Sequence, residues 1–385
     1  MGRKFLEKQV FPDAEEYWAD RGATMEPTEI DKGRIEMVPF FGHRAEPLSP
    51  PVAEEYIKQG DEIIGICITH DTLMSNGIDR AARVYVPQSP RFKQFTVHME
   101  TPYMTSEKGH NDYIARHCME RIGAPVVLVG PEYSTDQNCW VRECGRAALQ
   151  TMQEVGNLSL AESAEAGMKI GAQLCEEYEL PRKIVKIGES RAAMLAHAQA
   201  PYAKAAGLDI GYFDLTDPCS PEKIVRRTRD IAKVALWPAT ELAACAPVAF
   251  DMVRSGALWR QLGTLSGNPN ELLAIAASTR YLLGDEAGKV SKFMPHDAGF
   301  HEAYFKTNKI SNHKKWQEHF AENPLYGSVV LRGGHFNLGF SSVLRHVIDR
   351  VIRYGEQLEV DDKNVDWQQV HEPGKHNKAD LSLVA

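Results

Sequence analysis

The segment Ile-Gly-Glu-Ser-Arg-Ala-Ala-Met, residues 187–194, is the most informative stretch of this 385-residue chain. Before it, residues 183–188 form a short apolar run rich in β-branched side chains, which is typical of a buried strand. After it, residues 191–206 are rich in alanine, which favours a helix. The segment is therefore predicted to link a strand to a helix with almost no loop between them.

Ser190 lies at the centre of this link. Such a turn is so tight that the residues two positions before and two positions after the serine must be small, and Gly188 and Ala192 meet that need. The turn is expected to hold Ser190 in a strained backbone conformation, with its hydroxyl exposed above the sheet. The N-terminus of the following helix adds backbone N–H donors and a positive field, which suit the binding of an oxyanion.

Strand and helix patterns alternate on both sides of this link. The first two predicted strands, 62–69 and 82–87, flank the turn chemistry at 75–77 and should pair as a hairpin. Further strands are predicted at 94–99, 125–130, 183–188, 208–215 and 328–331, and helices at 111–122, 159–180, 191–206 and 341–354. This order predicts an α/β sandwich with a mostly parallel central sheet and an N-terminal antiparallel hairpin.

The pattern also divides the chain into segments. Between 221 and 283 the sequence is helical without clear strands, which indicates a helical cap inserted above one edge of the sheet. The predicted division is an N-terminal extension at 1–60, a core at 61–220 and 284–358, the cap at 221–283, and a loose polar C-terminal tail at 359–385.

Two motifs in this order resemble the α/β-hydrolase superfamily. One is the serine turn, and the other is Arg-Gly-Gly-His-Phe-Asn at 332–337, just after the last predicted strand. The resemblance covers roughly residues 62–355 as an order of elements, and Ala192 stands where the family usually has a second glycine. It implies that Ser190 is a nucleophile and that His335 is the base that activates it.

The resemblance also implies a third catalytic group, an acid that orients the histidine. Several residues are candidates for this acid. The usual position follows the penultimate strand, but the sequence at 303–312 contains no acid there. The other position follows the strand after the serine helix, where Asp217 precedes a proline and is favoured, with Asp214 behind it. Asp285 and Asp297 are alternatives if the penultimate strand lies elsewhere.

The same resemblance implies two oxyanion donors. The first is the backbone N–H of Arg191, directly after the nucleophile. The second normally comes from the loop after the first parallel strand, where this chain reads His-Met-Glu-Thr-Pro-Tyr at 98–103, so a backbone N–H near Glu100 or Thr101 is expected. The Arg191 side chain could meet an anionic substrate group or pair with a neighbouring acid.

Composition excludes several other classes. A net charge of −8 and an isoelectric point near 6.0 offer no basic face for nucleic acid. The seven cysteines are odd in number and include no CxxC pair, which argues against structural zinc and for reduced thiols in a cytoplasmic protein. No apolar run approaches the roughly 20 residues that a membrane span needs. No glycine-rich phosphate loop or metal-binding pattern appears, so neither a cofactor nor a metal is expected.

The predicted function is therefore that of a serine hydrolase that cleaves a carboxylic ester or related small acyl substrate. The alternative is a protein that keeps the fold but binds without turnover, since the acid is missing from its usual position and the oxyanion loop is altered. Acyl transfer or carbon–carbon hydrolysis on the same site is a third reading. The sequence does not specify the substrate, and it leaves a homo-oligomer open.

Overall fold

The computed structural model describes the chain over a defined set of residues, and predictions that fall elsewhere lie outside it. The described residues are 19, 22–31, 34–42, 47–75, 78–101, 110–130, 160–189, 191–217, 298–305, 317, 321–331 and 341–372. Ser190, His335, Asp285, Asp297 and the predicted cap at 221–283 are outside this set.

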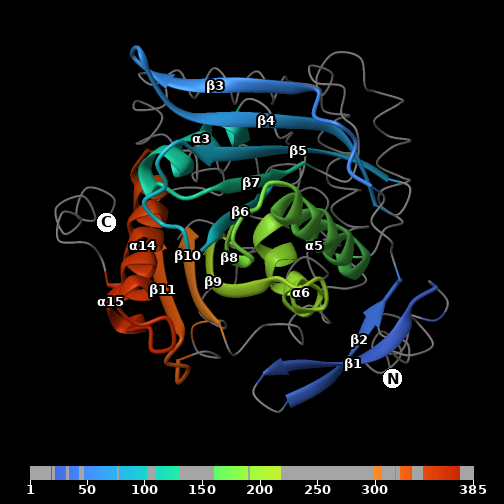
Figure 1. Cartoon of the computed structure of the whole chain (residues 1–385). Helices are drawn as coiled ribbons and strands as arrows, with labels where there is room; N and C mark the ends of the chain where they lie inside the picture. The colour runs from blue at the N-terminus through green and yellow to red at the C-terminus, as the bar shows by residue number, and fades with distance from the viewer. Residues whose placement is uncertain are drawn as a thin grey trace, which may run out of the picture.

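Within these residues, the centre of the molecule is a nine-stranded sheet of order β11-β10-β9-β8-β6-β7-β5-β4-β3 (Figure 1). Its strands are β3 (Ala53–Gln59), β4 (Glu62–Ser75), β5 (Ile78–Pro87), β6 (Thr96–Glu100), β7 (Val126–Val129), β8 (Lys183–Glu189), β9 (Asp209–Thr216), β10 (Gly299–Phe305) and β11 (Tyr326–Leu331). The pairs from β7 through β6 to β11 are parallel, and those from β3 to β7 through β4 and β5 are antiparallel. The predicted fold class is confirmed.

The predicted hairpin is also confirmed and is longer than expected. β4 and β5 pair antiparallel up to Ser75 opposite Ile78, with residues 76 and 77 between them. The register shifts between His70 and Leu73, where the ladder is irregular. In the strand order, this pair lies between the parallel part of the sheet and the edge strand β3.

Helices cover both faces of the sheet. They are α3 (His110–Ile122), α5 (Leu160–Glu177), α6 (Arg191–Ala205), α14 (Ser341–Val360) and α15 (Trp367–His371). Helices α3 and α14 share one buried core with the sheet. On the opposite face, α5 and α6 share a second cluster, and α6 also contributes to a third. No helix among the described residues is long and apolar enough to cross a membrane.

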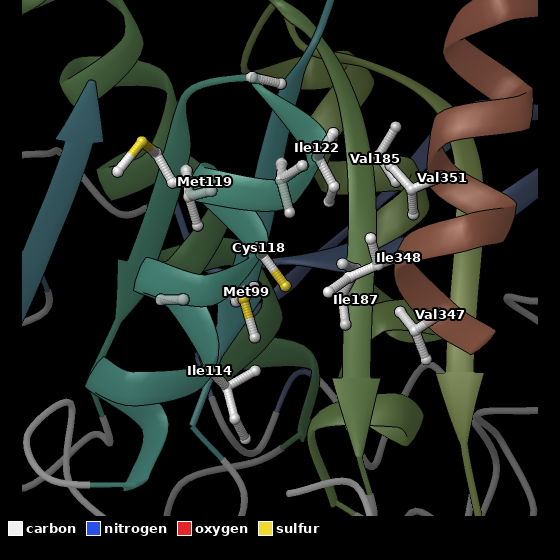
Figure 2. Packing of buried hydrophobic residues seen from close by; sticks show 14 of the residues in the cluster. Met99, Ile114, Cys118, Met119, Ile122, Val185, Ile187, Val347, Ile348 and Val351 are labelled. Carbon is white, nitrogen blue, oxygen red and sulfur yellow. The ribbon is translucent and has the colours of Figure 1, made fainter. Parts of the chain in front are cut away.

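The parallel strands are buried because helices cover both of their faces. All four residues of β7 are buried, as are all five of β6. Figure 2 shows Met99 and Ile187 of the sheet facing Cys118 of α3 and Ile348 of α14, and all four side chains belong to the same cluster. This packing holds the two strands that lead into the predicted site.

Ordered elements cross two of the predicted segment boundaries. The sheet begins at Ala53, inside the expected extension at 1–60, because β3 pairs with β4. The loose tail predicted from 359 is instead ordered through residue 372: α14 runs to Val360, and α15 packs its Trp367 ring against Gly299 of β10. An added Cβ at that glycine would overlap the indole ring, so the missing side chain provides the room.

Residues 24–40 of the N-terminal extension contain a separate two-stranded sheet. It consists of β1 (Thr24–Asp31) and β2 (Arg34–Phe40), which pair antiparallel. The end of β2 lies against α6, where the Tyr202 hydroxyl donates to the Pro39 carbonyl at 2.6 Å. The extension is therefore attached to the helices that cover the sheet.

Candidate active site

A strand and a helix flank Ser190 where the sequence predicts them. β8 ends at Glu189 and α6 begins at Arg191, so a single residue, Ser190, joins them. A Cβ added to Gly188 would lie 2.8 Å from the Ala192 carbonyl oxygen and 2.9 Å from the Ala193 Cα, both backbone atoms that cannot rotate away. Glycine is therefore required at 188, and the tightness of the turn is the physical reason.

The strands that precede the predicted site residues in the chain end at the same edge of the sheet. In the register of β8 with β9, Glu189 lies opposite Thr216. In the chain, Ser190 directly follows Glu189, and Asp217 directly follows Thr216. β11 ends beside β10 at the same edge, and the segment containing His335 follows it. Ligands of open α/β sheets bind at this edge.

Asp217 is buried and held at the end of β9. Its backbone N–H donates to the Ala303 carbonyl of β10 at 2.6 Å, which extends the ladder by one residue. Its φ of 51° lies in the left-handed region, which aspartate tolerates better than most residues. The chain therefore turns sharply at this residue, directly beside the strand that leads to Ser190.

Asp214, the second acid considered, is engaged elsewhere. Its carboxylate accepts from Arg350 of α14 at 2.7 and 2.8 Å and from the Tyr212 hydroxyl at 3.1 Å, all in the buried core. The Asp214 charge is the main attraction that raises the Arg350 pKa against the opposing effect of burial. This bidentate pair joins α14 to the sheet, and a structural role accounts for Asp214.

The position of β10 bears on the two remaining acids. The strand begins at Gly299, so Asp285 and Asp297 precede it in the chain and do not follow its carboxyl end. The residues that do follow, 306–312, contain no carboxylate in the sequence. The structural context therefore favours Asp217 among the four candidates.

Thr101, the predicted second oxyanion donor, follows the last residue of β6. Its backbone N–H donates to the Val129 carbonyl of β7 at 3.1 Å, so this amide is already bonded. Its hydroxyl is buried, and no hydrogen-bond partner is found for the Oγ1 atom. The bond to Val129 argues against the Thr101 amide as a donor to an oxyanion. The Thr101 hydroxyl could still donate a hydrogen bond.

A buried charged cluster that the sequence reading missed lies just below this edge. Glu100, the last residue of β6, accepts a hydrogen bond from Gln199 of α6. Its carboxylate also lies 3.5 Å from Arg80 Nη2 and 3.7 Å from Lys186 Nζ. Gly167 of α5 makes room for the cluster, because a Cβ there would lie 2.6 Å from Glu100 Oε1. The signal that could have revealed it is a lysine in the middle of the apolar strand 183–188.

Burial determines the protonation of this cluster. It lowers the pKa of Lys186 to about 8, with the charge of Glu100 opposing the shift and that of Arg80 adding to it. Burial also lowers the pKa of His98 well below its usual range, and the Lys186 and Arg80 charges add to the effect. Lys186 Nζ lies 2.7 Å from His98 Nδ1, so the neutral imidazole accepts from the ammonium. Together these contacts fix the end of β6.

A second buried carboxylate, on β10, contacts a histidine of α6. Glu302 of β10 accepts from the Tyr304 hydroxyl and lies 3.3 Å from His197 Nε2 on α6. Burial and the nearby Glu302 charge raise the pKa of Tyr304, which keeps the phenol protonated as a donor. In register, Glu302 is opposite Leu215 of β9, which is one residue before Thr216 and two before Asp217. Among the described residues, no group of three or more His, Cys, Asp or Glu side chains could hold a metal ion.

Comparison with known proteins gives structural likeness only. No family model and no curated protein sequence matches the chain. An esterase from Pyrobaculum calidifontis is similar with 14% identity and a TM-score of 0.46, covering 81% of this chain and 87% of that one. A cold-adapted esterase from an Arctic intertidal metagenomic library shares 11% identity at a TM-score of 0.46, covering 78% and 98%. The thioesterase domain from the curacin biosynthetic pathway shares 13% at 0.41, covering 78% and 99%.

The sheet defines the fold of the described residues. Its strand order, its antiparallel edge and the one-residue link between β8 and α6 are those of the α/β-hydrolase fold expected from the sequence. The likenesses above have TM-scores below 0.5, so the activity has to be argued from the residues of this chain.

Proposed function

We propose that this chain is a serine hydrolase that cleaves a carboxylic ester or related acyl compound through an acyl-enzyme on Ser190. The observation that carries the proposal is the single-residue link between β8 and α6, together with the requirement for glycine at 188. A serine in such a link presents its hydroxyl at the carboxyl edge of the sheet. The nearby end of β9 supplies Asp217, and the loop after β11 supplies His335.

The proposed mechanism has two halves. His335 takes the proton of the Ser190 hydroxyl as the oxygen attacks the acyl carbon, and the oxyanion that forms accepts from the backbone N–H of Arg191. The alcohol leaves with the proton held by His335. Water then attacks the acyl-enzyme, His335 takes its proton, and the acid product leaves as Ser190 is restored. Asp217 orients His335 and stabilises its charged form.

The first amides of α6 suit this role. The N–H groups in the first turn of a helix have no acceptor within the helix and carry the positive end of its dipole. Arg191 is the first residue of α6, so its N–H is one of these groups. The second donor is proposed among residues 101–109, with the Thr101 hydroxyl as the described candidate.

One observation favours the alternative of a fold kept for binding alone. The Thr101 amide is bonded to Val129, so the backbone donor expected from the sequence is already engaged. If the segment after β6 supplies no other donor, the oxyanion would lose one of its two hydrogen bonds, which costs about 10²–10³-fold in turnover. The same site would then bind an acyl compound without cleaving it at a useful rate.

Labelling with a fluorophosphonate probe separates the two readings. The wild-type chain should be labelled and should hydrolyse p-nitrophenyl esters of at least one acyl length, whereas Ser190→Ala should do neither. Labelling that persists in Ser190→Ala would refute the nucleophile. A labelled chain with only background hydrolysis across the panel would favour binding alone.

Asparagine substitutions at the two acids of β9 test the third catalytic group. Asp217→Asn should lower kcat by about 10²–10⁴-fold while the free energy of unfolding changes little. Asp214→Asn is the matched comparison: it removes the charge that Arg350 faces in the core, so it should cost about 3–5 kcal/mol of stability. Comparable kcat at Asp217→Asn and wild type would remove this residue from the mechanism.

A further inference from the structure

Among the described residues, no strand pairs with the outer edge of the sheet at β3. β3 is the last strand in the sheet order, and Figure 1 shows it as the outermost strand, with β4 on its inner side. Its residues 53–59 contain neither proline nor glycine, and five of the seven side chains are exposed. Tyr56, at the middle of the strand, is 68% exposed. A long exposed edge without breaking residues can pair with another strand.

The opposite edge of the sheet is protected in ways that β3 is not. Five of the six residues of β11 are partly or fully buried, and α15 packs beside it, with the His371 ring against Gly327. At the β3 edge, the one irregularity of the ladder is an extra residue, Ile64, which lies on β4. β3 itself therefore stays regular, with Glu54, Tyr56 and Lys58 on one face.

The sequence of β3 is complementary to itself. When two copies are paired antiparallel about Tyr56, all seven residues of one strand lie opposite the seven of the other. Glu54 then faces Lys58 of the second copy, and because the arrangement is two-fold symmetric this pair forms twice. Tyr56 faces its own counterpart, and Glu55 faces the apolar Ile57. Opposite charges and aromatic pairs are the cross-strand contacts that stabilise antiparallel sheets.

Neighbouring symmetric registers are worse. A register centred on Glu54 or on Glu55 places two carboxylates directly opposite each other, which is destabilising. A register centred on Ile57 loses the pairing of Glu54 with Lys58 and shortens the overlap. The charges along the strand therefore favour the one register in which the overlap is complete.

We propose that two copies of this chain associate through β3 in an antiparallel, two-fold symmetric pair centred on Tyr56, which joins the two sheets into one. A seven-residue antiparallel pair supplies about seven backbone hydrogen bonds, and the exposed Glu54–Lys58 pairs add to them and weaken with salt. Because an edge contact covers a small area, the association should be weak and concentration-dependent. The proposal does not depend on the catalytic assignment.

A charge-swap series in sedimentation velocity tests the pairing. The wild-type chain should shift from monomer to dimer as its concentration rises. Lys58→Glu and Glu54→Lys each create two like-charge pairs, so each should raise the dissociation constant about tenfold or more. The double variant Glu54→Lys/Lys58→Glu restores opposite charges and should restore the dimer. Glu55→Lys alters the strand charge as much as Glu54→Lys does, but it faces Ile57 and should leave the dimer in place.

Two outcomes would overturn the proposal. One is a wild-type chain that sediments as a monomer at every concentration reached, and the other is a double variant that dissociates as readily as the single ones. Circular dichroism of each variant establishes that loss of the dimer is not loss of the fold.

Cysteine cross-linking tests the symmetry centre directly. Opposite residues of an antiparallel pair have Cα atoms about 4.5–5.5 Å apart, which a disulfide can span. Tyr56→Cys should therefore form a disulfide-linked dimer under mild oxidation. Val52→Cys is the matched control, because it is also exposed, at 58%, yet its two copies would lie about 27 Å apart in this register. Cross-linking of Val52→Cys but not of Tyr56→Cys would contradict the proposed register.

Discussion

Lys186 is a charged side chain in the middle of a strand that is covered on both faces. Lysine is almost never fully buried unless it is paired, and here the partners are Glu100 and His98. Removing one partner of a buried ionic group leaves the other without compensation. At the scale of single residues, ionic contacts and hydrogen bonds therefore position the end of β6. At the end of β8, the close approach of the α6 backbone is possible because Gly188 has no side chain.

The lowered pKa of Lys186 predicts how stability changes with pH. Between about pH 8 and 10.5 the unfolded chain holds a proton on this lysine and the folded chain does not, so the free energy of unfolding rises as the pH rises through this window. Below pH 8 both states are protonated and the cost of burial is fully present. Lys186→Met should remove up to about 3 kcal/mol of this rise, as measured by urea unfolding at several pH values.

Lys183 supplies the control for this measurement. It lies on the same strand but is only partly buried, and Lys183→Met should leave the wild-type pH dependence in place. Equal slopes for Lys186→Met and the wild-type chain would show that the buried ammonium is not the group responsible.

At the scale of elements, the short helix α15 closes one face of the sheet. The Trp367 ring stacks with Tyr212 and Tyr354, and three glycines of the underlying strands make room for the aromatic side chains of α14 and α15. His371 Nε2 lies 3.1 Å from the Leu325 carbonyl and donates to it, so its Nδ1 accepts from His301 Nδ1 at 3.4 Å. This contact requires a neutral His371 imidazole, because its Nδ1 must keep a lone pair to accept the hydrogen bond.

The histidine pair predicts that α15 loosens at acidic pH. Burial, with a further contribution from Arg350, lowers the pKa of both His301 and His371. The unfolded chain therefore takes up these protons first, and stability that is complete above about pH 6.5 falls as the pH drops below it. His371→Gln should flatten this fall, and hydrogen exchange of the α15 amides between pH 5 and 7 would show it.

A substitution on the same helix is the comparison for that experiment. Gln368→Ala changes an exposed position of α15 and should keep the acid-induced rise in exchange. If His371→Gln exchanges with the wild-type pH dependence, the pair does not control the docking of α15.

At the scale of the whole molecule, the sequence predicts the sheet well and its two ends poorly. The strands from β4 to β9 and the serine link have patterns that local chemistry dictates, such as the glycine at 188. α15 and β3 carry mixed polar sequences whose apolar positions, such as Trp367 and Ile57, are meaningful only once a partner surface exists. The buried cluster around Glu100 combines three strands and a helix, and its one local signal, the lysine inside the apolar strand 183–188, does not indicate its partners.

The N-terminal hairpin gives a prediction at this same scale, because it can be either an appended arm or part of the cooperative fold. Val38 of β2 is fully buried in the cluster that includes α5 and α6, whereas its neighbour Met37 is 47% exposed. If the hairpin unfolds together with the sheet, Val38→Ala should lower the global free energy of unfolding by about 1–2 kcal/mol, while Met37→Ala should change it by less than about 0.5 kcal/mol. Urea unfolding followed by circular dichroism measures both. An unchanged midpoint in Val38→Ala would mean that β1 and β2 detach before the rest of the molecule unfolds, and that the contact of Tyr202 with Pro39 does not couple them to the sheet.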